Sequence, residues 1–251
     1  MNIKSLFCSF LLINSFPMLA HAVIIEGTFT GSVTQAQSLG DDSGSLLWSD
    51  DIVGKAIAGN FWYDTDLTPV NGSNRENEAI YFSRNNWIGL VFNIDGKTVD
   101  ISRGRHKTLE VTERVDVLTL ANHVPAVNGD SNENMMIYDS TFFGDPNAEF
   151  KETSGFVSFN ESIVNVLNGI GSVQEFDWFN QSDPATSFGN AYFATSSLLQ
   201  GQYAYADATM DISEIHASIR DASVPEPSSL ALLSIAMLTL VGRSKIHTSL
   251  G

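Results

Sequence analysis

Hydrophobic and polar residues alternate along much of the chain with a period of two, which is typical of half-buried β-strands. In residues 23–37, for example, Ile25 and Phe29 alternate with threonine, serine and glutamate side chains. Residues 108–120 alternate in the same way, and the aromatic-rich residues 56–66 end on aspartates that suit a turn. These patterns predict strands in all three segments.

A tight hairpin is predicted within residues 88–102, because Asp95-Gly96 separates two alternating apolar arms and an Asp-Gly pair favours a two-residue turn. Further strands are predicted, separated by turn-rich stretches, at residues 135–142, 154–159, 190–195 and 210–220, while residues 162–173 are ambiguous. Many short strands without long helical periods predict an all-β fold: a single antiparallel β-sandwich domain, similar to a jelly roll, over residues 23–223.

The N-terminal segment departs from this alternation. Lys4 precedes an apolar run, and Ala20 and Ala22 supply small residues at the positions that a signal peptidase recognises. A buried N-terminal helix is the alternative, but it leaves this order of features unexplained. We therefore expect a signal helix in residues 1–22, removed by signal peptidase after Ala22, and export of the protein.

The C-terminal segment joins a Pro-Glu-Pro motif to an uncharged run and a basic end. Pro225, Glu226 and Pro227 precede a 15-residue span at 228–242, and Arg243 follows it. Proline keeps the preceding chain out of a helix, and a basic residue after a span stays on the cytoplasmic side. The span is short for a membrane helix, so spacing alone also permits a buried terminal helix. Because the protein is expected to be exported, we favour a short transmembrane helix over a buried helix for this span.

Residues 224–245 resemble the PEP-CTERM sorting signal of Gram-negative bacteria, in the Pro-Glu-Pro, the apolar span and Arg243. The resemblance implies a substrate of an exosortase, a membrane protease or transpeptidase that acts near the Pro-Glu-Pro. It further implies an inner-membrane intermediate, held by the C-terminal span, and then a location at the outer surface or outside the cell. Residues 59–66 (GNFWYDTD) are also similar to a strand in many proteins that carry this signal, which supports the fold without implying an activity.

The charge balance excludes one class of partner. The chain has 13 basic and 29 acidic residues, and the end segments hold three of the former and one of the latter, so residues 23–223 carry a net charge of −18. Such a surface repels nucleic acid, and no nucleic-acid partner is expected. The one cysteine, Cys8, lies in the signal segment, so neither a disulfide nor cysteine-based chemistry is expected in the exported part.

The acidic residues raise the hypothesis of a calcium site, because calcium prefers clustered oxygen ligands. The first candidate is a turn with oxygen-bearing side chains at alternate positions, Asp130, Asn132 and Asn134, and the second is Asp64 with Asp66. A solvated polar turn is the alternative, and it is the more common explanation of such residues. No other cofactor is expected.

No catalytic motif is present: the histidines of the exported part are scattered, and there is no G-x-S-x-G sequence. A glycosidase needs two facing carboxylates, and Glu175 and Asp177 beside Trp178 are the most suggestive pair. Trp178 has two interpretations, a ring that stacks on a sugar or a core residue. Arg103 and Arg105 lie in the one basic cluster, which suits either an anionic polysaccharide or a solvated hairpin end.

These observations favour a non-enzymatic, exported protein of the cell surface or extracellular matrix, associated with exopolysaccharide in a biofilm and able to bind carbohydrate. The alternative is a secreted β-sandwich enzyme that acts on glycans with a carboxylate pair.

Overall fold

The computed structural model describes residues 23–39, 52–73, 75–102, 109–125, 131–145, 147–181 and 186–220. These residues form eleven β-strands: β1 (Ile24–Leu39), β2 (Ala56–Asp64), β3 (Glu78–Ser83), β4 (Ile88–Ile94), β5 (Lys97–Asp100), β6 (Val111–Pro125), β7 (Ser131–Gly144), β8 (Phe150–Glu161), β9 (Phe176–Phe179), β10 (Ser187–Leu199) and β11 (Gln202–Arg220). The predicted all-β, antiparallel fold is confirmed.

The signal helix and the C-terminal transmembrane helix were predicted in segments that lie outside the described residues. Within the described part of the chain, no helix is long and apolar enough to cross a membrane.

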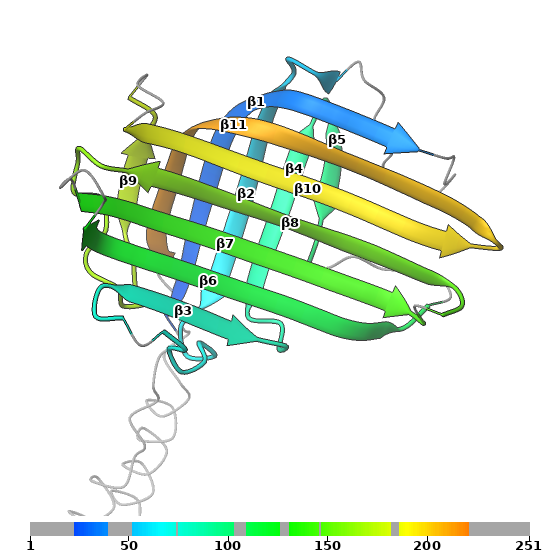
Figure 1. Ribbon diagram of the computed structural model, residues 1–251, viewed down its shortest axis with the longest axis horizontal. Coiled ribbons are helices and arrows are strands. Elements are labelled where there is room, and N and C mark those ends of the chain that lie inside the picture. Colours follow the sequence, from blue (N-terminus) through cyan, green and yellow to red (C-terminus); the bar gives the residue numbers. More distant parts are fainter. Residues whose placement is uncertain are drawn as a thin grey trace, which may run out of the picture. The chain divides into compact units, whose positions relative to one another are not determined.

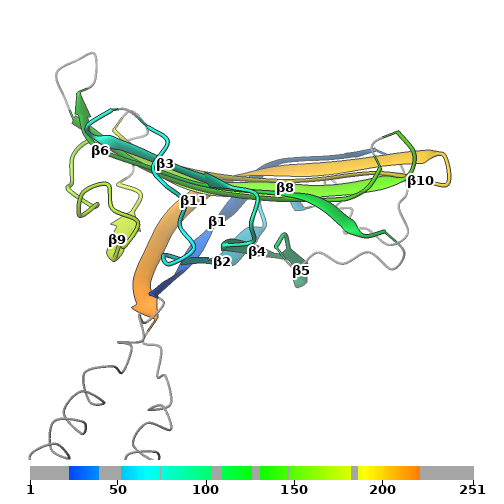
Figure 2. The same ribbon diagram turned by 90° about the horizontal axis from the view of Figure 1, so that it is seen from below.

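All eleven strands belong to one sheet, in the order β3-β6-β7-β8-β10-β11-β1-β2-β4-β5, with β9 paired to β11 outside this order. The first strand, β1, pairs with the last strand, β11, over most of its length. The sheet curls back on itself into two layers (Figures 1 and 2). The two layers expected of a sandwich are thus present, but they are parts of one sheet and not two separate sheets.

We call the two layers by the length of their strands. The long-strand layer holds β3, β6, β7, β8, β10 and the first part of β11, and the short-strand layer holds β9, the end of β11, the start of β1, β2, β4 and β5 (Figure 2). The core lies between them. Phe92 of β4 meets Phe193 of β10 with ring centroids 6.1 Å apart, and Phe29 of β1 meets Phe92 at 5.4 Å. These three rings are at most 1% exposed.

A β-bulge at Ser213 lies where β11 passes from one layer to the other. β11 pairs with β10 as far as Ile212 and with β9 from Glu214 onward, and its register with β1 shifts at the same place. The extra residue changes which positions face the core: Met210 and Ile212 are buried before it, and Ile215 after it. Because a bulge bends a strand and increases its twist, this one helps the sheet to curl.

The predicted strands are all found, several of them longer than predicted. The Asp95-Gly96 hairpin is confirmed: Ile94 pairs with Lys97, and both turn residues have left-handed φ angles, 49° and 76°, as a type I′ turn requires. The ambiguous residues 162–173 form no strand.

Candidate functional site

The predicted calcium ligands fall on different strands, and only some are described. Asp130 lies outside the described residues, Asn132 and Asn134 lie in β7, and Asp64 ends β2. The Asp64 carboxylate accepts a hydrogen bond from the backbone N–H of Asp66 at 3.0 Å, which is the geometry of an aspartate turn. Among the described residues, no group of three or more His, Cys, Asp or Glu side chains is placed to hold a metal ion.

Of the three predicted glycan contacts, the structure describes only Trp178. Arg103 and Arg105 lie outside the described residues. Trp178 of β9 is 1% exposed, its ring stacks on Phe159 at 5.4 Å, and its Nε1–H donates to the carboxylate of Glu161. Trp178 is therefore a core residue, the second of its two interpretations, and offers no ring face to a sugar.

Facing carboxylates do occur in the structure, and one pair is Glu133 of β7 with Glu161 of β8. Both are at most 3% exposed. Glu133 Oε2 accepts backbone N–H groups of Val166 and Leu167 at 2.6 and 2.8 Å, and Glu161 Oε1 accepts that of Ile163 at 2.8 Å. The pair therefore anchors the irregular segment that leads from β8 to β9.

The second pair is Asp116 of β6 with Asp139 of β7, direct cross-strand partners with no exposed surface. Asp116 Oδ2 accepts the backbone N–H groups of Trp87 and Ile88 at 2.8 and 3.0 Å, whereas neither oxygen of Asp139 has a partner in the described part of the chain. Burial raises the pKa of Asp116 to about 6. Burial and the neighbouring Asp116 raise the pKa of Asp139 well above its ordinary value.

We infer that at least one of the two aspartates is protonated, because two adjacent buried carboxylates cannot both ionise. A glycan cannot reach carboxylates as deeply buried as either pair, so neither pair supplies the facing acids of a glycosidase.

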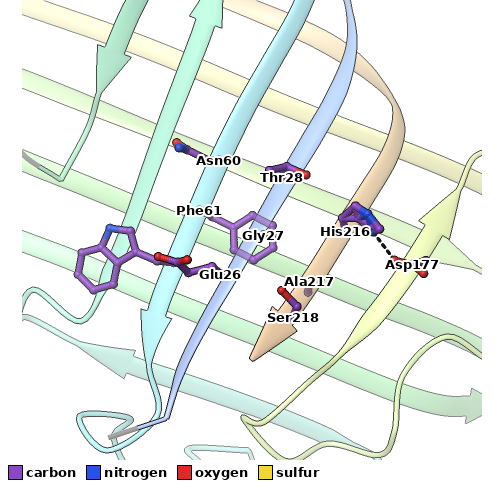
Figure 3. A pocket seen from close by; sticks show the side chains of 10 residues that line it. Glu26, Gly27, Thr28, Asn60, Phe61, Asp177, His216, Ala217 and Ser218 are labelled. Carbon is purple, nitrogen blue, oxygen red and sulfur yellow. Dashed lines mark hydrogen bonds and ion pairs between the residues drawn. The ribbon is translucent and has the colours of Figure 1, made fainter. Parts of the chain in front are cut away.

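A surface cavity of about 420 Å³ lies on the outer face of the short-strand layer, over β9, β11, β1 and β2 (Figure 3). We call it the Trp62 cavity. It is lined by Glu26, Gly27, Thr28, Asn60, Phe61, Trp62, Asp177, His216, Ala217 and Ser218.

The strand register places these side chains side by side. Thr28 of β1 is the direct partner of Asn60 on β2 and of His216 on β11, and Glu26 is the partner of Trp62. Since alternate residues of a strand face the same side, every second residue of neighbouring strands points into the cavity while the residues between them face the core.

The Trp62 indole lies across the backbone of Gly89 on β4. A Cβ atom at Gly89 would lie 2.0 Å from Nε1 and 2.4 Å from Cε2 of Trp62, so only glycine allows the ring to rest there. Trp62 itself is half-buried. A ring held against a strand in this way leaves its other face for a ligand, and indole combines an apolar face with one hydrogen-bond donor.

The charged groups of the Trp62 cavity are paired. Glu26 Oε1 lies 2.7 Å from Nη2 of Arg220, and Asp177 is hydrogen-bonded to Nδ1 of His216, as the dashed line in Figure 3 marks. By contrast, the polar groups of Thr28, Asn60 and Trp62 have no partner within the described residues. The cavity thus offers a hydroxyl and an amide to a ligand, beside the indole ring of Trp62.

Sequence reasoning named Asp177, but for Trp62, as for the other tryptophans, it favoured a place in the core over a contact with a sugar. The alternation of residues 56–66 contained the signal, because placing Phe61 and Tyr63 in the core leaves Trp62 on the outer face.

A family model described as the PEP-CTERM protein-sorting motif matches residues 223–245. This match confirms the resemblance seen in the sequence: the C-terminal segment carries a PEP-CTERM motif, consistent with an exosortase substrate, and the motif implies export through the membrane to the cell surface. Neither a curated protein nor a solved structure matches the chain.

Proposed function

We propose that this protein is a non-enzymatic component of the cell surface or of an exopolysaccharide matrix, and that it binds a polysaccharide in the Trp62 cavity. The observation that carries the proposal is the Trp62 indole held across Gly89 beside the unpartnered side chains of Thr28 and Asn60. A sugar ring has an apolar C–H face and a rim of hydroxyls, which match an open indole face and neighbouring hydrogen-bonding groups.

The charge of the molecule favours a neutral glycan. Residues 23–223 carry a net charge of −18, which repels uronic-acid or sulfated polymers. At the cavity, Arg220 pairs with the carboxylate of Glu26, and His216 is hydrogen-bonded to the carboxylate of Asp177. A neutral sugar therefore meets neither strong repulsion nor an unpaired charge.

The second candidate is a glycan-active enzyme, favoured by the presence of Glu26 and Asp177 in one cavity. Glycoside hydrolysis requires one carboxyl group that is free to donate a proton and another that acts as nucleophile or base. Since both carboxylates already have basic partners, a binding role accounts for them better than catalysis.

The test is binding of the secreted protein to immobilised neutral glucans, with alginate as the anionic comparison. Trp62→Ala should weaken binding about tenfold or more, as expected when a central aromatic contact is removed. Phe179→Ala is the matched control, because Phe179 is an exposed aromatic residue of β9, 56% exposed, outside the cavity lining. Equal binding by wild type and Trp62→Ala would refute the site, and release of soluble sugar would favour the enzyme.

A further inference from the structure

The outer face of the long-strand layer carries no charge at its centre. Five successive cross-strand partners form one row over β3, β6, β7, β8 and β10: Phe82, Val117, Tyr138, Phe156 and Tyr192. The rows on either side run from Ile80 to Asn190 and from Val115 to Ala194. No outward position in these three rows is charged. We call these rows the uncharged face.

None of the described elements covers this face. Figure 1 looks directly onto it, and in Figure 2 the short-strand layer lies on the other side of the sheet. Phe82 is 50% exposed, and Tyr138, Phe156 and Tyr192 are half-buried only by their neighbours in the same sheet. In a domain of net charge −18, a broad apolar and uncharged surface marks an interaction site.

The arrangement of the rings favours a protein partner over a sugar. Phe156 stacks on Tyr192 with centroids 6.0 Å apart, and next to the uncharged face Phe142 stacks on Phe150 at 5.5 Å. These rings cover one another's faces, unlike the Trp62 indole, so they present edges and aliphatic side chains. Such a surface suits the packing of one sheet on another.

The size and charge of the face fit a second copy of the chain. Five strands about 4.8 Å apart and three rows about 6.7 Å apart span about 24 by 20 Å. This area corresponds to the apolar centre of an interface that buries about 800 Å² per partner, with the surrounding polar positions as its rim. Two acidic copies also repel each other least where neither carries charge.

We propose that two copies of this protein pack face to face through the uncharged face and form a symmetric homodimer. The two short-strand layers then lie on the outside, and each Trp62 cavity faces away from the interface. The dimer itself does not depend on what the cavities bind.

The experiment is sedimentation analysis of the protein secreted by cells that express the full chain, over a range of concentrations. Wild type should sediment with twice the monomer mass at tens of micromolar. Ser154→Glu, on β8 in the row of the uncharged face that runs from Val115 to Ala194, should weaken association about a hundredfold or more. Ser154→Lys should weaken it as well, although it lowers the net negative charge, which separates a local effect from general repulsion.

The matched controls are Ala58→Glu and Ala58→Lys, which place the same charges at an exposed position on the outer face of the short-strand layer and should leave the dimer intact. Thermal melts check that every variant is folded. A monomeric wild type, or a dimer that persists in both Ser154 variants, overturns the proposal. If the wild type is monomeric and Ser154→Glu loses binding to glucan, the proposal is also overturned, because the face would then bind a glycan.

Discussion

Asp139→Asn should stabilise the protein as the pH rises, because it removes a carboxyl group that must keep a proton in the core. Asp116 and Asp139 are adjacent and have no exposed surface. Burial raises the pKa of both above the ordinary value near 4, so the folded protein keeps a proton that the unfolded chain releases. Stability from this pair is therefore complete below about pH 4 and declines as the pH rises.

The magnitude follows from the number of protons. One proton bound only by the folded state costs about 1.4 kcal/mol of unfolding free energy per pH unit. An amide at position 139 takes up no proton, so the part of this slope that comes from position 139 disappears. Between pH 5 and pH 7 the variant should gain stability relative to wild type, by no more than about 2.7 kcal/mol, which is about 5 to 11 °C in melting temperature for a domain of this size.

Denaturant unfolding of wild type and Asp139→Asn at pH 5, 6, 7 and 8 measures this difference. Asp211→Asn is the control, because it also removes one carboxylate but from an exposed position of β11, and its effect should not change with pH in the same range. If the stability difference between wild type and Asp139→Asn is the same at all four pH values, the pair does not hold a proton and the reasoning fails.

Three further outcomes are expected. Glu226→Ala should leave an unprocessed form held in the membrane; intact mass after fractionation checks this, and a secreted variant lacking residues 228–251 would contradict it. Gly59→Ala should destabilise the fold by about 1 to 3 kcal/mol in denaturant unfolding, since the new Cβ would lie 2.0 Å from Cζ of Phe29; an unchanged midpoint argues against it. Calcium should raise the melting temperature no more than sodium at matched ionic strength, because screening of net charge relieves repulsion without a specific site; a calcium-specific rise removed by chelator would revive the site at Asp130.

Local pattern predicted the strands because their inner faces are regular. In β1, Ile25, Phe29 and Val33 fall on one side of a period-two alternation and are at most 2% exposed. The Asp95-Gly96 turn needs only two residues with left-handed backbone, which its own sequence supplies. Both features depend on neighbours in sequence, so a single sequence reveals them.

The pairing of strands depends on distant residues and could not be predicted. The bulge at Ser213 exists because β11 exchanges β10 for β9 as its partner, and nothing in the sequence around it differs from an ordinary strand. In β6, the sequence pattern also failed to show which side of the strand faces the core. Val115 and Val117 form its apolar alternation, yet they face outward, while Asp116 faces the core.

The candidate site was missed for a related reason. Residues 174–181 (QEFDWFNQ) suggested a tryptophan beside acids, and only the pairing of β9 with β11 decides that Trp178 faces inward and Asp177 outward. The ring of Trp62 rests on Gly89, which lies on β4 and is separated from β2 in the sequence by β3, so the residues around Trp62 do not reveal this contact.

The pairing of β1 with β11 has a consequence for the order of events during secretion. A chain that emerges from a membrane with its N-terminus first exposes β1 long before Arg220, the residue that pairs with Ile24, has appeared. Contacts between such distant segments form slowly, because the intervening chain must first be brought together. The N-terminal strand therefore keeps one edge unpaired until almost 200 further residues have emerged, and the sheet becomes complete only when β11 is present.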